Sequence, residues 1–211
     1  VAQQVDQAAP IVYGAIPAGA VMELAQREDI AGIFLHEREG FVDLTDSIAI
    51  ANTDDAHTAG FRGAGINVAV YEDGPSDLTD LVIAGQFDTT PPASNHARLT
   101  SAIIRNSEAN LPHGHAPDCN LFSANSMDLD AIRWAAQTQH CTVISQSFHR
   151  DSEQTSDTMS FDDIYKDNLA LNWPYPTICH AAGNGTSTEF VNHKGFNTLT
   201  LGSHDDTAAA M

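Results

Sequence analysis

The feature that most constrains the fold is a short apolar run, residues 68–71 (VAVY), which follows a glycine-rich turn and ends on Glu72, Asp73 and Gly74. Such a run is too short for a helix. It lacks the polar alternation of a half-exposed strand, so it predicts a strand covered on both faces, as in a parallel sheet. Functional groups of open α/β sheets gather where strands end. The run therefore either carries a functional carboxylate at Glu72 or closes on a solvated acidic turn.

Strand and helix patterns alternate through the rest of the chain. Apolar runs that predict further strands lie at residues 81–84, 120–124, 142–148, 176–182 and 197–202. Apolar stripes at helical spacing lie at residues 96–106, 128–138 and 161–171. Strands that alternate with helices of about ten residues indicate parallel pairing. The sequence thus predicts an α/β fold of three layers, a doubly wound, mostly parallel sheet with helices on both faces.

The N-terminal residues have a rhythm of their own. Residues 10–16 and 30–35 predict strands, and residues 18–27 between them carry apolar side chains at helical spacing. Residues 43–65 contain many Asp, Asn and Gly residues and predict an irregular connection. We therefore expect a small β-α-β extension over residues 1–45 and a main domain over residues 46–211.

Composition excludes several kinds of partner. The 211 residues include 9 Lys and Arg against 28 Asp and Glu, a formal net charge of −19, which repels phosphate backbones and anionic lipid. We expect no nucleic-acid partner and no membrane partner. No apolar run approaches the roughly 18 to 20 residues that span a bilayer, and the first residues lack the basic and apolar regions of a signal peptide.

The three cysteines Cys119, Cys141 and Cys179 show no C-x-x-C spacing, which argues against a zinc site and against a dense disulfide scaffold. Cys119 and Cys141 each begin one of two consecutive predicted strands, so a bridge between them is geometrically allowed. Three free thiols are equally compatible with the sequence. Both alternatives stay open.

Five segments in chain order resemble motifs of the subtilisin-like serine peptidases, the subtilases, and the resemblance runs from about residue 60 to the last residue. Glu72 falls where the family's V-A-V-x-D-x-G places the acid of its catalytic triad. His96 falls on the first histidine of H-G-T-H-V-A-G-I-I. Residues 114–121, 143–149 and 181–185 resemble G-V-A-P-x-A-x-L, V-I-N-M-S-L-G and A-A-G-N-x-G.

The resemblance implies a serine endopeptidase with named roles for these residues. His96 would remove the proton of a serine hydroxyl, Glu72 would orient the imidazole, and Asn184 would donate to the oxyanion. By the same resemblance, six residues would bind the substrate: Ser147, Phe148, His149, Ala181, Ala182 and Gly183. The implied partner is a peptide or protein substrate, and secretion is the expected location.

The departures from the family pattern are specific. A glutamate replaces the usual aspartate, and Asp73 remains an alternative acid, although the pleat predicts that it points to the opposite face from Glu72. Arg98 replaces a small residue beside the cleft. The family's G-T-S-x-A motif is absent from these residues. We therefore expect the sheet to be incomplete at the C-terminus and the serine to lie in the C-terminal remainder of the same polypeptide.

A rival function stays open, a catalytically inactive subtilase fold that binds peptides or serves as a structural domain. The resemblance implies no cofactor and no assignable metal, although structural calcium is common in the family. His140, His180 and His193 are scattered singles, for which we expect surface or hydrogen-bonded positions. Residues 13–34 resemble the closing half of a subtilase propeptide, and a simple N-terminal extension fits them equally well.

Overall fold

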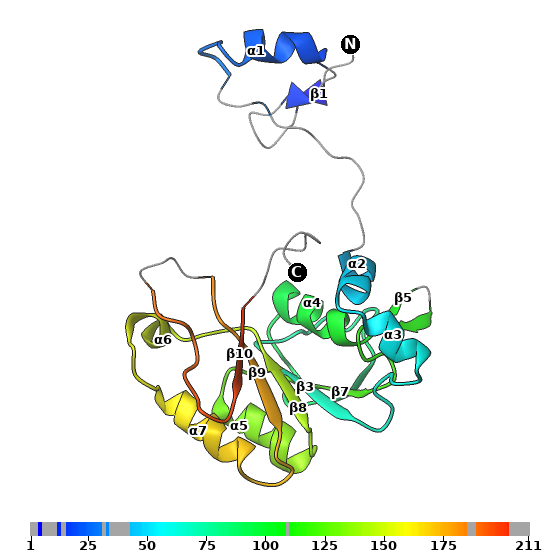
Figure 1. Cartoon of the computed structure of the whole chain (residues 1–211), viewed down its shortest axis with the longest axis vertical. Helices are drawn as coiled ribbons and strands as arrows, with labels where there is room; N and C mark the ends of the chain where they lie inside the picture. Colours follow the sequence, from blue (N-terminus) through cyan, green and yellow to red (C-terminus); the bar gives the residue numbers. More distant parts are fainter. Residues whose placement is uncertain are drawn as a thin grey trace. The chain divides into compact units, whose positions relative to one another are not determined.

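The structure of the protein is a computed structural model, in which residues 4–5, 12–13, 16–30, 33, 43–108, 110–184 and 189–202 are described (Figure 1). The chain divides into two units, Val1–Val42 and Asp43–Met211. All of the predicted site residues, from Glu72 to Asn184, belong to the second unit.

In the first unit, the described residues contain two short strands and one short helical segment. β1 (Gln4–Val5) pairs antiparallel with β2 (Val12–Tyr13), and η1 (Ala18–Ala20) leads directly into α1 (Val21–Leu24). The second strand of the predicted β-α-β extension is not found at Ile30 or Ile33, and the remainder of residues 30–35 lies outside the described residues. At Ile30 the backbone N–H instead closes a turn onto Arg27 O at 3.2 Å. A local turn has thus replaced strand pairing there.

The second unit is built on a six-stranded sheet with the order β10-β9-β8-β3-β7-β4, in which every neighbouring pair is parallel. Its strands are β3 (Asn67–Tyr71), β4 (Ile83–Gln86), β7 (Asn120–Ala124), β8 (Val143–Gln146), β9 (Thr177–Ala181) and β10 (Leu199–Leu201). The predicted parallel α/β sheet is confirmed. β3, which contains the apolar run 68–71, lies in the interior of the sheet between β7 and β8.

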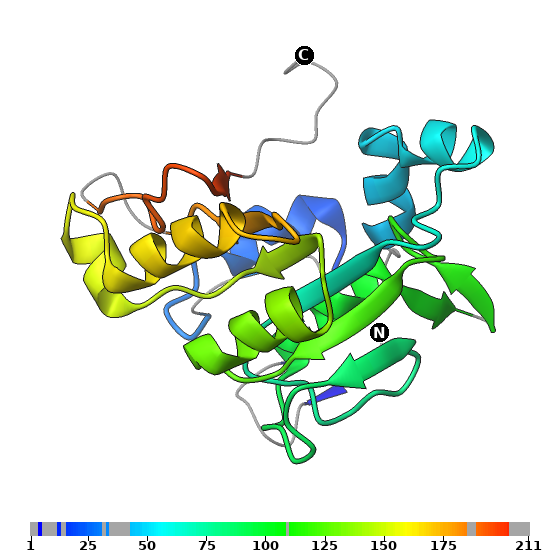
Figure 2. The same cartoon turned by 90° about the horizontal axis from the view of Figure 1, so that it is seen from below.

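Helices cover both faces of this sheet. On one face Val68 and Val70 of β3 pack with Ile104 of α4 (Asn95–Ile104). On the other face, Ala69 and Tyr71 join a larger apolar cluster with three helical segments. These segments are α5 (Leu129–Arg133), the π-helical η2 (Trp134–Thr138) and α7 (Phe161–Ala170). Figures 1 and 2 show α5 and α7 together on one side of the sheet. Since successive side chains of β3 point to opposite faces, both faces bury apolar surface.

Four regions differ from the sequence prediction. The irregular connection predicted over residues 43–65 instead contains α2 (Asp43–Ile50) and α3 (Thr53–Thr58). A hairpin of β5 (Asn106–Glu108) and β6 (Leu111–His113), and α6 (Asp151–Thr155), were not predicted. The strand predicted at 81–84 lies at Ile83–Gln86, where it pairs with β7.

Contacts from distant residues explain the two unexpected helices. The His115 ring lies 2.9 Å from Ser47 Oγ and 2.8 Å from Thr53 Oγ1, and His57 Nε2 lies 3.1 Å from His115 O. These polar contacts bring α2 and α3 against residues more than fifty positions away. The composition of residues 43–65 favoured a loop, because it does not record these distant contacts. His115, which lies in a loop, therefore holds both helices in place.

The structure answers the question that the sequence left open about the cysteines. Cys119, Cys141 and Cys179 are free thiols, so the structure has the unbridged alternative for Cys119 and Cys141. Burial raises the pKa of the Cys141 thiol to about 12.

Among the helices of the described residues, none is long and apolar enough to cross a membrane.

Two isoleucines offer a matched test of this packing. Ile144, on β8, is completely buried, whereas Ile164, on α7, is 56% exposed. We expect Ile144→Ala to lower the free energy of unfolding by about 2–5 kcal/mol, because it leaves a cavity between the sheet and its helices. Ile164→Ala should change it by no more than about 0.5 kcal/mol. Urea unfolding followed by circular dichroism measures both, and equal losses would contradict this account of the core.

Candidate active site

The carboxylate of Glu72 is held in a buried position at the carboxyl end of β3. Its backbone N–H donates to Ala124 O at 3.3 Å, which extends the pairing of β3 with β7 by one residue. The side chain is 1% exposed. Its Oε1 accepts a hydrogen bond of 2.9 Å from Ser147 N, just beyond the end of β8. Two neighbouring strands thus fix both the backbone and the side chain of this acid.

His96 stands opposite Glu72 because of where α4 begins. Ser94 is the N-cap of the helix, and its Oγ accepts from Ala97 N at 3.2 Å, which places His96 in the first turn. His96 Nδ1 lies 3.4 Å from Glu72 Oε2, and the His96 side chain is 59% exposed. The structure therefore brings these two predicted residues together, with Glu72 rather than Asp73 at the imidazole.

The environment of Glu72 shifts its pKa upward, toward the neutral form. Burial is the largest influence and raises the pKa of the carboxyl, whereas the positive charge of His96 and the Ser147 N–H act in the opposite direction. The net direction is upward from the ordinary value of 4.5. The 3.4 Å contact is longer than the 2.7–2.9 Å typical of a charge-assisted hydrogen bond, so the ion pair compensates only part of the desolvation.

A pocket of about 330 Å³ lies at the ends of β8 and β9 and contains most of the predicted substrate-binding residues. The predicted residues in its lining are Ser147, Ala181, Ala182, Gly183 and Asn184. Ser147 also donates to Glu72, so one residue connects the pocket with the Glu72–His96 pair. Asn184 is exposed at the pocket, where its amide is accessible.

Phe148 and His149 do not line this pocket. Phe148 is 8% exposed, and its ring packs edge-on against Tyr71 with the ring centroids 4.9 Å apart. Its carbonyl oxygen accepts from Gln146 Nε2 at 2.9 Å. His149 is exposed outside the pocket.

Asn192 supports the pocket wall, and the sequence prediction missed it. Gly183 has a φ of 110°, and a Cβ at this position would lie 2.5 Å from Asn192 Nδ2. Asn192 N also donates to Ala182 O at 3.0 Å. The buried Asn192 side chain therefore occupies the space that the glycine leaves beside Asn184. A glycine immediately before Asn184 was the only sequence signal of this close approach.

Arg98, which was expected beside the cleft, is engaged by the loop that precedes β4. Its Nη2 donates to Thr79 O at 2.9 Å, and its guanidinium nitrogens lie 3.8 Å from carboxylate oxygens of Asp77 and Asp80. The arginine thus connects the first turn of α4, which carries His96, to this loop.

Comparisons with known proteins give a likeness of fold. No protein-family model and no curated protein matches the chain. The structure of the MycP3 protease from the type VII (ESX-3) secretion system matches with a TM-score of 0.51 and 19% identity, over 75% of this chain and 58% of that one. MycP1 with its N-terminal propeptide removed gives 0.47 and 24%, over 69% and 50%. MycP1 from Mycobacterium smegmatis gives 0.45 and 22%, over 73% and 49%.

The match to the MycP3 protease shows the fold. The parallel sheet with its covering helices is the subtilisin-like α/β fold of that structure. The chain spans about half the length of the solved structures that it matches.

The raised pKa of Glu72 predicts a pH-dependent cost to stability. Well below pH 4.5 the carboxyl is protonated in the unfolded and folded states alike. As the pH rises further, the unfolded state ionises first, so the wild type loses stability until the pKa of the folded state is passed. Glu72→Gln keeps the acceptor for Ser147 N and cannot ionise. We expect it to gain stability over the wild type with rising pH, by about 1.4 kcal/mol for each pH unit between the two pKa values.

Urea unfolding from pH 4 to pH 8 measures this difference. Asp54→Asn, on the exposed surface of α3, is the control for the general loss of one negative charge from an acidic protein. A difference between Glu72→Gln and the wild type that stays constant over this range would show that Glu72 is not destabilised by burial.

Proposed function

We propose that this chain carries the acid, the general base and the oxyanion donor of a subtilisin-like serine endopeptidase that hydrolyses peptide bonds. The observation that carries this proposal is the buried Glu72 carboxylate at 3.4 Å from Nδ1 of the exposed His96, joined through Ser147 to the pocket that contains Asn184. The serine nucleophile would come from the C-terminal remainder of the same polypeptide, and the substrate would be a peptide or protein.

The proposed mechanism assigns one task to each residue. Since Nδ1 of His96 faces Glu72, Nε2 is the nitrogen available to a serine hydroxyl. It would take the hydroxyl proton during attack on the peptide carbonyl and return it to the leaving amine. Glu72 would keep a proton on Nδ1 and stabilise the imidazolium that forms. The Ser147 N–H holds Glu72 Oε1, which leaves Oε2 directed at the ring.

The pocket supplies the second half of the proposal. The exposed amide of Asn184 would donate to the oxyanion that develops on the substrate carbonyl. The backbone of Ser147 and of residues 181–183, at the ends of two parallel strands, would bind the substrate beside the cleaved bond, as an added strand does. Phe148 would contribute indirectly, because its buried ring anchors the segment that carries Ser147.

The fold shared with the MycP3 protease supports a peptidase without deciding the reaction, since one fold supports many activities. The proposed chemistry requires no cofactor, because the serine, the imidazole and the amide supply every group that acts. A net charge of −19 is compatible with a secreted enzyme, and secretion is part of the proposal.

We expect the polypeptide extended to include its downstream residues to react with a fluorophosphonate, which labels activated serines. His96→Ala should abolish the labelling and lower kcat for peptide hydrolysis on the order of 10⁶-fold, because the serine then has no base. The matched control is His140→Asn, an exposed histidine whose ring packs on Trp173. Gel fluorescence and steady-state hydrolysis of a peptide library measure both.

Two outcomes would overturn this proposal. Labelling that is equal in His96→Ala and the wild type would remove His96 as the base. If the downstream residues lack the G-T-S-x-A motif and the folded protein binds peptides without cleaving them, the inactive peptide-binding alternative is correct.

Asn184→Ala should lower kcat by about 10²- to 10³-fold with little change in KM, because the amide would act on a charge that exists only in the transition state. Asn168→Ala, an exposed position on α7, is the control. Steady-state kinetics on one peptide substrate separate the two constants. A change in KM alone would assign Asn184 to substrate binding instead.

A further inference from the structure

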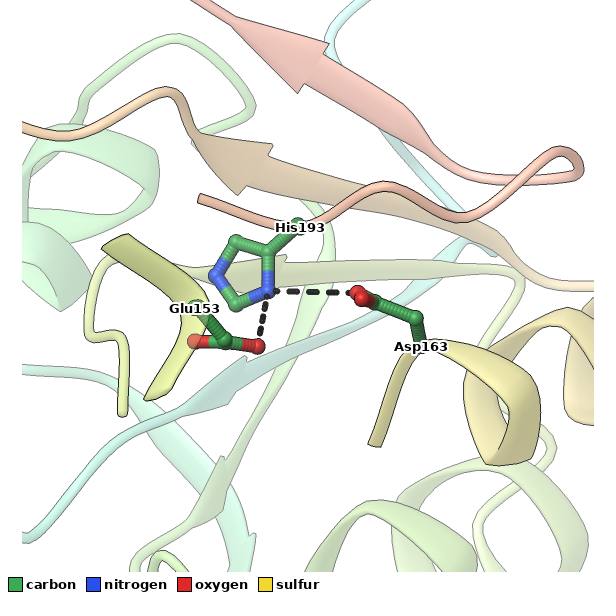
Figure 3. Close-up of side chains that lie close together, drawn as sticks. All are labelled: Glu153, Asp163 and His193. Atoms are coloured by element: carbon green, nitrogen blue, oxygen red, sulfur yellow. Dashed lines mark ion pairs between the residues drawn. The ribbon is translucent and has the colours of Figure 1, made fainter. Parts of the chain in front are cut away.

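Away from the candidate active site, three buried polar side chains from separate segments converge. They are Glu153 on α6, Asp163 on α7 and His193 in the segment before β10, and each is 1% exposed. His193 Nδ1 lies 3.0 Å from Glu153 Oε1 and 3.8 Å from Asp163 Oδ1 (Figure 3). One donor atom from each residue falls within 4.8 Å of the other two.

Backbone groups hold each of the three side chains in this orientation. Glu153 Oε2 accepts from Arg150 N at 2.6 Å, and Asp163 Oδ2 accepts from Ser160 N at 2.8 Å. His193 Nε2 lies 3.0 Å from Phe148 O, to which it donates. A metal-binding histidine typically donates its second ring N–H to a carbonyl in this way. Each side chain therefore presents its remaining donor atom to the shared space.

Two of these presented atoms, Asp163 Oδ1 and His193 Nδ1, are buried and have no hydrogen-bond partner within the described part of the chain. His193 Nδ1, at 3.8 Å, is too far to donate to Asp163 Oδ1. A buried carboxylate oxygen without a partner costs about 1–3 kcal/mol or more. This atom indicates that the cluster is complete only with a further electropositive group.

We propose that Glu153 Oε1, Asp163 Oδ1 and His193 Nδ1 bind one divalent transition-metal ion, with Zn²⁺ as the expected class. Carboxylate oxygens and imidazole nitrogens bind zinc at about 2.0–2.2 Å, so neighbouring ligand atoms of a tetrahedral site lie about 3.3 Å apart. The separations from Nδ1, 3.0 and 3.8 Å, lie on either side of this distance. The two carboxylate oxygens lie within 4.8 Å of each other, so modest side-chain shifts would form the site.

The charged groups around the cluster define the competing explanation. Lys166 is fully buried beside it, and its Nζ has no hydrogen-bond partner in the described structure. Arg150 is paired with Asp162 at 2.6 Å, and the His180 ring stacks on His193 with the centroids 4.1 Å apart. A proton on His193 and the Lys166 ammonium would balance the two carboxylates without any metal. The two explanations differ in what occupies His193 Nδ1.

The ion would join three segments that already lie in contact. Lys194 Nζ donates to Glu153 O at 2.6 Å and Phe190 N donates to Gln154 O at 3.0 Å, so the His193 segment already lies along α6. Its neighbour Asn192 fills the space under Gly183 at the pocket. The ion would therefore stabilise the pocket wall from behind, and its binding can be measured without any peptidase activity.

The test uses the 211-residue chain freed of metal by a chelator and titrated with Zn²⁺ or Co²⁺. We expect one ion per chain, tetrahedral visible bands with Co²⁺, and a rise in Tm of about 5–10 °C at a zinc concentration about 100-fold above Kd. Asp163→Asn and His193→Gln should weaken binding at least about 100-fold. The controls His140→Asn and Asp151→Asn, both at exposed positions, should bind as the wild type does.

The proposal fails if Asp163→Asn binds cobalt as the wild type does, or if the wild type shows neither the bands nor the rise in Tm. Nitrogen-15 NMR of the wild type gives an answer that depends on no variant. With zinc at one equivalent, His193 Nδ1 should carry no proton. A doubly protonated His193 under these conditions would establish the ionic alternative.

Discussion

The pairing of β3 with β7 on one side and β8 on the other is the constraint on which the rest of this structure depends. A strand with apolar side chains on both faces can be stabilised only where helices cover both faces, which places it in the interior of the sheet. Its carboxyl end then lies next to the ends of two other strands. Glu72 is buried as a consequence, because Ala124 holds its backbone and Ser147 holds its side chain.

Burial of this carboxylate has a cost that function would explain. Desolvation raises its pKa, and the exposed His96 at 3.4 Å compensates only in part. A structure optimised for stability alone would have an apolar or amide side chain at this position. A buried acid 3.4 Å from an exposed imidazole, beside a pocket at the strand ends, suits the nucleophilic catalysis that we propose. The glutamate is long enough to reach the ring, although the contact is loose.

The sequence predicted elements well where a local pattern carried the information. β7 was predicted at its observed bounds, because a run of small and apolar residues has no alternative to burial in the sheet. The approach of His96 to Glu72 followed from the resemblance to the subtilases, whose motifs place both residues in a catalytic triad. α2 and α3 were missed because His115, far along the chain, holds them. Phe148 was misplaced because its ring packs against Tyr71 in the core, a contact between residues 77 positions apart that no local pattern records.

By itself, the sequence determined the parallel α/β fold and the candidates Glu72, His96 and Asn184, because periodicity and motif order are written in neighbouring residues. Only the tertiary structure decided which acid faces the imidazole, which residues line the pocket, and that Asn192 supports Gly183. It alone brought Glu153, Asp163 and His193 together, although His193 had been expected only as a surface or hydrogen-bonded single residue. The reason is physical. Side chains forty residues apart meet only after the sheet has formed, and no local pattern records which atoms then share a buried space.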